Sequence, residues 1–242
     1  MESTESKVSA AQWPLLIFAL LFPTLLTWVY FILLAKEPEV TQQLAFSIGK
    51  GIQFALPLVW VYFRNPARFG FPPRSLRGVG EGIVFGLIVG AAMLIAYHWW
   101  LKPGGYFVAA AAEVNAKVQG LGAGTPVRFL FMALFYCVVH SLLEEYYWRW
   151  FVFGELRQVQ RWPIAAVVSG IGFTAHHVLV IGMYFGWSSP LTVLFSLAVT
   201  IGGIYWAWLY QRSGSLLGPW VSHLLIDGAI FVVGWDLLNL VN

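Results

Sequence analysis

Charged residues are scarce in this sequence of 242 residues. Lys, Arg, Asp and Glu make up 10% of it, whereas 59% is hydrophobic and the mean hydropathy is +0.73. A typical soluble domain is about 25% charged. This composition excludes an ordinary soluble domain and is typical of a helical membrane protein. The formal net charge of +3 comes from a few arginines in loops, so it does not indicate binding to nucleic acid.

Cysteine is almost absent as well. The one cysteine, Cys137, excludes an internal disulfide framework, and we expect it to be a small apolar packing residue. The sequence shows no internal repeat and no stretch with the composition of a soluble domain. It therefore predicts one integral-membrane domain over residues 1–242, with the lipid bilayer as its surroundings.

Long apolar runs are what the sequence has in abundance. A bilayer core about 30 Å thick requires about 20 apolar residues per helix. By that length we predict seven spans, at residues 13–35, 46–63, 79–101, 127–153, 163–184, 190–210 and 216–241. A break at Gly228 would divide the last span, so the expected fold is an all-α transmembrane bundle of seven to eight helices. Residues 104–124 are predicted to form an interfacial helix or a flap.

The positions of the arginines predict the orientation in the membrane. Four of them, and no acidic residue, lie in the loop at residues 64–78: Arg64, Arg68, Arg74 and Arg77. Basic loops stay in the cytoplasm, so this loop and the N-terminus are expected inside. Alternating spans then place Arg157, Arg161 and Arg212 inside as well.

The fourth span carries two adjacent carboxylates and a guanidinium in "FYCVVHSLLEEYYWRW", residues 135–150. A charge at a helix centre costs about 3 kcal/mol on insertion scales, so such residues are rare and usually face an interior cavity. Glu145 and Arg149 are four residues apart, the spacing of a salt bridge along a helix. Glu144 points about 100° away and lacks that partner. A purely structural ion pair between Glu145 and Arg149 is the alternative.

Two more polar clusters lie in later spans. "FTAHHV" places His176 and His177 in the fifth span, and "SHLLIDG" places His223 and Asp227 four residues apart in the seventh. Depths counted at 1.5 Å per residue let Glu144, His177 and His223 converge on one pocket in the cytoplasmic half. Histidines that only pack between helices, and an Asp227 that only orients His223, are the alternatives. His140, one turn before Glu144, receives less weight.

A carboxylate with histidines and an arginine-paired neighbour suits the activation of water, because a base must take the proton of the water and donors must stabilise the oxyanion. Other hydrolase signatures are missing: Ser169 does not lie in Gly-x-Ser-x-Gly, and neither Gly-x-Gly-Asp nor His-Glu-x-x-His occurs. The residues Glu144, His177 and His223 could still ligate a metal ion.

Three motifs in this order resemble one known family. Glu144-Glu145-x-x-x-Arg149, Phe173-x-x-x-His177 and His223-x-x-x-Asp227 are similar to those of the CPBP family, the CAAX-prenyl-protease and bacteriocin-processing (Abi) glutamic intramembrane proteases. The resemblance covers residues 127–228. It implies a membrane fold of about eight helices, a cavity open toward the cytoplasm, no cofactor, and endopeptidase cleavage near the C-terminus of a membrane-associated protein or peptide.

The resemblance also implies roles for the residues that match. Glu144 would be the base that activates water, with help from His177, whereas Glu145 and Arg149 would hold the geometry of their helix. The oxyanion would be stabilised by His223 and by position 227. Eukaryotic members have Asn there, and an ionised Asp227 cannot donate a hydrogen bond. Asp227 would therefore be protonated or would only orient His223.

The resemblance leaves the substrate open, with prenylated CAAX proteins and bacterial C-terminal sorting tails as the two classes. The compact chain favours a prokaryotic member in the inner membrane. Three other functions remain possible from the sequence. They are a metal-dependent protease with the same residues, a non-catalytic immunity or binding protein, and a proton-coupled transporter, since carboxylates and histidines also relay protons.

Overall fold

The structure is a computed structural model, and it describes residues 12–64 and 75–239. Within these ranges the chain forms helices and no strand. Arg68 and Arg74 of the predicted cytoplasmic loop lie outside the described residues, as do the last residues of the predicted seventh span.

Seven helices in the described part of the chain are long and apolar enough to cross a membrane, which confirms the predicted helical bundle. They are Gln12–Leu33, Glu39–Arg64, Val79–Leu101, Pro126–Val159, Trp162–Phe185, Pro190–Ser213 and Leu217–Leu238. The predicted bounds differ most in the second and fourth helices. The second begins at Glu39 rather than at residue 46, and the fourth continues to Val159 rather than to residue 153.

Most of these spans consist of a single labelled helix. They are α2 (Glu39–Arg64), α8 (Trp162–Phe185), α9 (Pro190–Ser213) and α10 (Leu217–Leu238). The first span joins α1 (Gln12–Trp28) to the π-helical η1 (Val29–Leu33), and the third joins α3 (Val79–Ala96) to η3 (Tyr97–Leu101). The helix α10 runs through Gly228 without interruption, so this glycine does not divide the seventh span into two.

The fourth span is one continuous helix made of five segments. They are α5 (Pro126–Leu134), η4 (Phe135–His140), α6 (Ser141–Glu145), η5 (Tyr146–Phe153) and α7 (Gly154–Val159). The two η segments have π-type hydrogen bonding, a local widening that is frequent at functional sites. They enclose α6, which carries Glu144 and Glu145.

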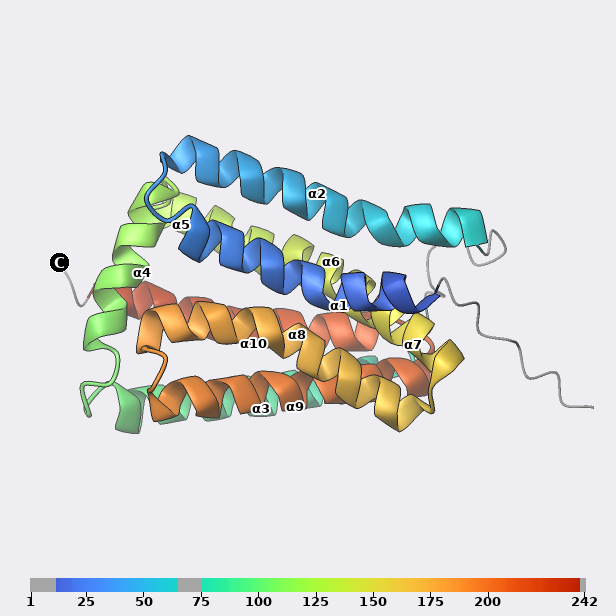
Figure 1. Cartoon of the computed structure of the whole chain (residues 1–242). Coiled ribbons are helices and arrows are strands. Elements are labelled where there is room, and N and C mark those ends of the chain that lie inside the picture. The colour runs from blue at the N-terminus through green and yellow to red at the C-terminus, as the bar shows by residue number, and fades with distance from the viewer. Residues whose placement is uncertain (1–11, 65–74, 240–242) are drawn as a thin grey trace, which may run out of the picture.

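A short helix closes one end of the bundle. The long helices run lengthwise beside one another, and α4 (Val108–Gly120) lies across their ends (Figure 1). The side chains of Ala110, Ala111 and Val118 are buried, and α4 packs against α8 and α10. The segment predicted as an interfacial helix or a flap is thus a helix that covers the end of the bundle.

Small residues bring α3 and α10 into close contact. The glycines at positions 82, 86 and 90 repeat every four residues on one face of α3, and all three are buried. A Cβ atom at Gly82 would collide with the carbonyl oxygen of Gly218, and one at Gly86 would lie 2.9 Å from that of Ser222. Such small residues let the backbones of membrane helices approach closely, which gives van der Waals contact that lipid would not provide.

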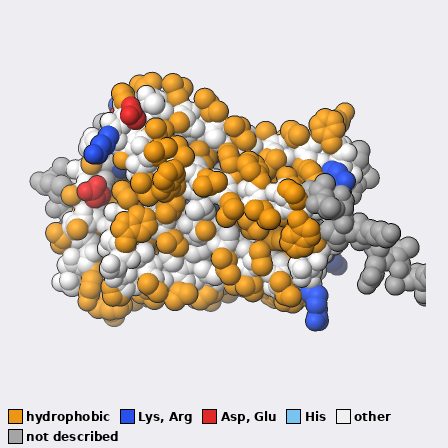
Figure 2. Space-filling model, viewed as in Figure 1, with side chains coloured by type: hydrophobic (Ala, Val, Ile, Leu, Met, Phe, Trp, Pro, Cys, Tyr) orange, Lys and Arg blue, Asp and Glu red, His pale blue; other side chains and the backbone are white. Residues whose placement is uncertain are grey.

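The lateral surface of the molecule is apolar. Hydrophobic side chains cover most of the face in Figure 2, and large exposed ones occur on every span, among them Leu21, Ile48, Leu87, Phe131, Ile171, Leu197 and Val232. Patches of this size are unfavourable in water and favourable in lipid. Together with the seven helices they describe an integral, multi-pass membrane protein.

We expect Gly82→Ala to destabilise the protein, because the new methyl group would force α3 away from α10. Overpacking of this kind costs about 1–3 kcal/mol, which a thermal unfolding assay in detergent measures as a lower midpoint. Gly80→Ala is the matched control in the same helix, since its Cβ would meet nothing within 4 Å. Equal midpoints for the two variants would contradict the close contact.

Candidate active site

The polar residues of α6 and η5 lie inside the bundle, not at its surface. Glu144 is 3% exposed, Glu145 is fully buried and Arg149 is 1% exposed. They are flanked by Tyr147, Trp148 and Phe151, which are buried as well. A buried charge must be paired and hydrogen-bonded to be tolerated, so the neighbours of these three groups determine what the site can do.

Three imidazole rings face the carboxylate of Glu144. Its Oε1 lies 3.3 Å from Nε2 of His140 and 3.5 Å from Nε2 of His176, and its Oε2 lies 3.8 Å from Nε2 of His223. These rings come from η4, α8 and α10. Arg149 is not a partner of Glu144, as the helical spacing predicts. The structure does bring His140 to the site, although it received little weight from the sequence alone.

The carboxylate of Glu145 contacts both Arg149 and His223. Its Oε2 forms an ion pair with Nε of Arg149 at 3.1 Å, the pair predicted from the spacing, and its Oε1 lies 2.8 Å from Nδ1 of His223. The guanidinium of Arg149 lies over the rings of Phe173 and Trp206, with 4.6 Å and 4.9 Å from its Cζ to the centroids. Glu145 thereby connects the fourth span to α10, and Arg149 connects it to α8 and α9.

The ring of His223 is held in one orientation. Its Nδ1 is engaged by Glu145, and its plane stacks on Trp206 with centroids 4.3 Å apart. Its Nε2 therefore points toward Glu144 and lies 3.6 Å from Oδ1 of Asp227. The nitrogen that orients the ring is bound by Glu145, whereas Asp227 approaches the nitrogen that faces the site.

The two histidines of α8 differ in their contacts. Nδ1 of His177 donates a hydrogen bond to the carbonyl oxygen of Phe173 at 2.9 Å, because a carbonyl can only accept. This leaves Nε2 of neutral His177 as an acceptor. His176 lies parallel to the ring of Trp148, and one ligand atom each of Glu144, His176 and His177 lie within 4.8 Å of one another. Such a set of one carboxylate and two imidazoles suits a metal ion as well as a water molecule.

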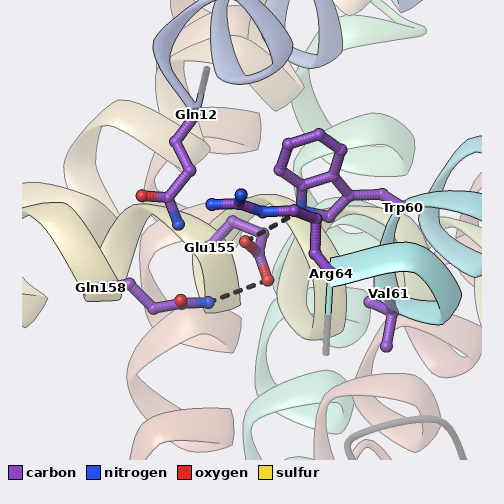
Figure 3. Close-up of a pocket in the computed structure, with 6 residues that line it drawn as sticks. All are labelled: Gln12, Trp60, Val61, Arg64, Glu155 and Gln158. Atoms are coloured by element: carbon purple, nitrogen blue, oxygen red, sulfur yellow. Dashed lines mark hydrogen bonds between the residues drawn. The ribbon is translucent and has the colours of Figure 1, made fainter. Parts of the chain in front are cut away.

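The second span is fixed beside this site by polar contacts. Near the end of α2, Nε1 of Trp60 donates to Oε2 of Glu155 at 3.2 Å, and Nε2 of Gln158 donates to Oε1 of Glu155 at 2.9 Å. These side chains line a small pocket together with Gln12, Val61 and Arg64 (Figure 3). Further along α2, the hydroxyl of Tyr146 donates to the carbonyl oxygen of Phe54 at 3.4 Å. The middle of α2 is thus held next to η5.

The structure brings together all six residues singled out from the sequence and adds others. His176 contacts Glu144, although the motif pointed to His177. Lys50 of α2 approaches the span that carries Glu144, since its Nζ lies 5.4 Å from the ring of Phe54, whose carbonyl oxygen accepts from Tyr146. It is the only lysine in the seven spans, a signal visible in the sequence. The predicted second span, residues 46–63, contains Lys50 four residues from its start, although this residue was not singled out from the sequence.

Residues 126–229 match the protein family described as Type II CAAX prenyl endopeptidase Rce1-like. The match spans the four helices that carry the site and confirms the resemblance to the CAAX protease family. It indicates a peptidase of the intramembrane CAAX type. No curated protein and no solved structure matches the chain.

We expect Arg149→Met to destabilise the protein strongly, because it leaves the carboxylate of Glu145 without its cation. Removing one partner of a buried ion pair costs about 3–5 kcal/mol. A thermal unfolding assay in detergent should therefore show a much lower midpoint than for Arg157→Met, a control at an exposed arginine of α7. The double variant Glu145→Gln/Arg149→Met should recover part of the loss, and no recovery would contradict the pairing.

Proposed function

We propose that the protein is a glutamic intramembrane endopeptidase that cleaves a membrane-associated protein or peptide near its C-terminus. The observation that supports this most is the carboxylate of Glu144, which is buried in a membrane-spanning bundle and faced by histidines from three elements. The match to CAAX endopeptidases over the same helices agrees with it.

In the proposed reaction Glu144 is the general base. A water molecule bound between Glu144 and the histidines of α8 gives a proton to the carboxylate while its oxygen attacks the carbonyl carbon of the substrate. Nε2 of His177 accepts a hydrogen bond from the second hydrogen of this water and so orients the molecule. Nε2 of His176 helps to hold the carboxylate of Glu144. Collapse of the tetrahedral intermediate returns the proton from Glu144 to the leaving amine. General-base catalysis requires this contact within hydrogen-bond reach.

The oxyanion is proposed to form beside His223. Since Nδ1 of His223 is engaged by Glu145, the ring can donate to an oxyanion only through a second proton on Nε2. Oδ1 of Asp227 lies 3.6 Å from this nitrogen. In this arrangement Asp227 supports the donor on His223, and an additional hydrogen bond from Asp227 itself requires its protonated form.

The remaining residues are proposed to position the reacting groups. Glu145 and Arg149 do not contact the water but fix the ring of His223 and the helix that carries Glu144. The arginines Arg64, Arg77, Arg157, Arg161 and Arg212 all lie at the end of the bundle where the loop at residues 64–78 begins and ends. The positive-inside rule makes this end cytoplasmic. We propose a prokaryotic inner-membrane protein whose site opens toward the cytoplasmic half, with a CAAX-type protein or a C-terminal sorting tail as substrate.

Glu144→Gln should abolish proteolysis without unfolding the protein, because the amide keeps the shape of the side chain but cannot take a proton. We expect the rate to fall about 10²–10⁴-fold. The measurement compares membrane proteomes of cells with the wild-type protein and with Glu144→Gln, read by mass spectrometry for shifted C-termini, and then repeats the cleavage with purified protein.

Glu39→Gln is the control, because this carboxylate is exposed at the start of α2. It should cleave as the wild type does. If the C-termini are the same in wild-type and Glu144→Gln cells, or if the cellular phenotype of the wild-type protein persists in Glu144→Gln, the non-catalytic binding protein is supported instead.

A metal-dependent protease is the second candidate, because Glu144, His176 and His177 place three ligand atoms within 4.8 Å of one another. Glu144 would then be a ligand rather than the base, and the ion would supply the Lewis acid. The glutamic mechanism predicts that a chelator leaves cleavage unchanged and that elemental analysis of active protein finds no stoichiometric zinc. One zinc per chain, lost in His176→Ala together with the activity, would favour the metal enzyme.

A further inference from the structure

Lys50 lies well inside α2, 11 residues from Glu39 and 14 residues from Arg64, the two ends of the helix. At 1.5 Å per residue these ends are about 16 Å and about 21 Å away. Its side chain is half-buried against the bundle. A charged side chain within a membrane helix usually faces the protein interior.

The ammonium of Lys50 has aromatic neighbours but no acidic one at contact distance. Nζ lies 5.4 Å from the ring centroids of both Phe46 and Phe54, and within the described ranges no carboxylate lies within 4.0 Å of it. Phe54 in turn contacts the span that carries Glu144, because its carbonyl oxygen accepts a hydrogen bond from the hydroxyl of Tyr146. Cation–π contacts offset part of the cost of this placement, yet the three hydrogens of the ammonium remain available for an acceptor.

The carboxyl groups of the site make a further cation favourable when a substrate with its own carboxylate binds. Glu144, Glu145 and Asp227 supply three carboxyl groups, and the guanidinium of Arg149 is already engaged by Glu145 and by two aromatic rings. A peptide that is cleaved near its C-terminus brings its own carboxylate into this low-dielectric region. Repulsion by the acidic residues would oppose its binding unless a positive group meets it.

We propose that Lys50 binds the free α-carboxylate of the substrate and so makes the protein specific for a true C-terminus. This inference rests on the proposed endopeptidase function. Two or three extended residues span about 7–10 Å, so a carboxylate held by a lysine near Glu144 leaves a bond within the last few residues at the catalytic carboxylate. The charge-assisted hydrogen bonds would select a free acid over a neutral C-terminal amide.

A different role for Lys50 makes a different prediction. If the ammonium only stabilised the anion of Glu144, its removal would slow the cleavage of every substrate by the same factor. If it binds the C-terminus, its removal slows the cleavage of the free acid and leaves that of the amide largely unchanged. The ratio of the two rates therefore separates the roles.

The experiment uses two membrane-tethered peptides with a prenylated cysteine near the C-terminus, identical except that one ends in a carboxylate and the other in an amide. For the purified full chain in liposomes we expect kcat/KM to be about tenfold to a hundredfold higher for the acid. Lys50→Met should bring the ratio close to one, and Lys50→Arg should preserve it. Lys36→Met, a control at an exposed lysine outside the spans, should behave like the wild type.

A wild-type protein that cleaves both peptides equally, or a Lys50→Met variant that keeps the preference, would overturn the inference and leave the proposed function intact. If Lys50→Met does not fold, Lys50→Gln takes its place with the same expected ratio. Binding of the two peptides to Glu144→Gln protein gives a second readout that needs no catalysis. Binding that prefers the acid and depends on Lys50, without cleavage by the wild type, would reject the endopeptidase and retain the carboxylate site.

Discussion

The contacts of Glu145 are the constraint on which the rest of the site depends. This fully buried carboxylate binds Arg149 on its own helix and His223 on α10. A carboxylate without partners in the interior of a membrane protein is costly, and a pair that loses one partner is costlier than no pair at all. The fourth span and α10 must therefore stay in one register. Because Arg149 also lies against Phe173 and Trp206, the same charge pair fixes α8 and α9.

This polar centre is possible because the helices around it are packed by apolar and small residues. The glycines of α3 let α10 approach closely on one side, and buried aromatic rings of η5 pack against α1 and α8 on the other. The apolar surface of the bundle faces lipid, and the charged groups of the site do not. The chain thus keeps its ionisable residues buried, in an environment of low dielectric where their interactions are strong.

Glu144 and Glu145 are adjacent in the sequence but have different surroundings. Glu145 is paired with a guanidinium, whereas Glu144 is faced by imidazoles. The proposed roles differ accordingly, with proton transfer at Glu144 and a fixed ion pair at Glu145. Lys50, whose Nζ lies 5.4 Å from the ring of Phe54, comes from a helix outside the segment that matches the CAAX endopeptidases.

The sequence by itself determined the class of fold, the approximate position of the spans and six residues of the polar centre. Apolar runs of bilayer length and charges within them are one-dimensional signals, and the pair Glu145–Arg149 follows from helical spacing alone. Only the tertiary structure decided that His140 and His176 contact Glu144, that Glu145 rather than Asp227 holds Nδ1 of His223, and that Lys50 lies half-buried against the bundle. These contacts depend on how each helix is rotated about its axis and on its height relative to its neighbours. The sequence pattern does not specify either quantity, and a small change in one of them changes which side chains meet.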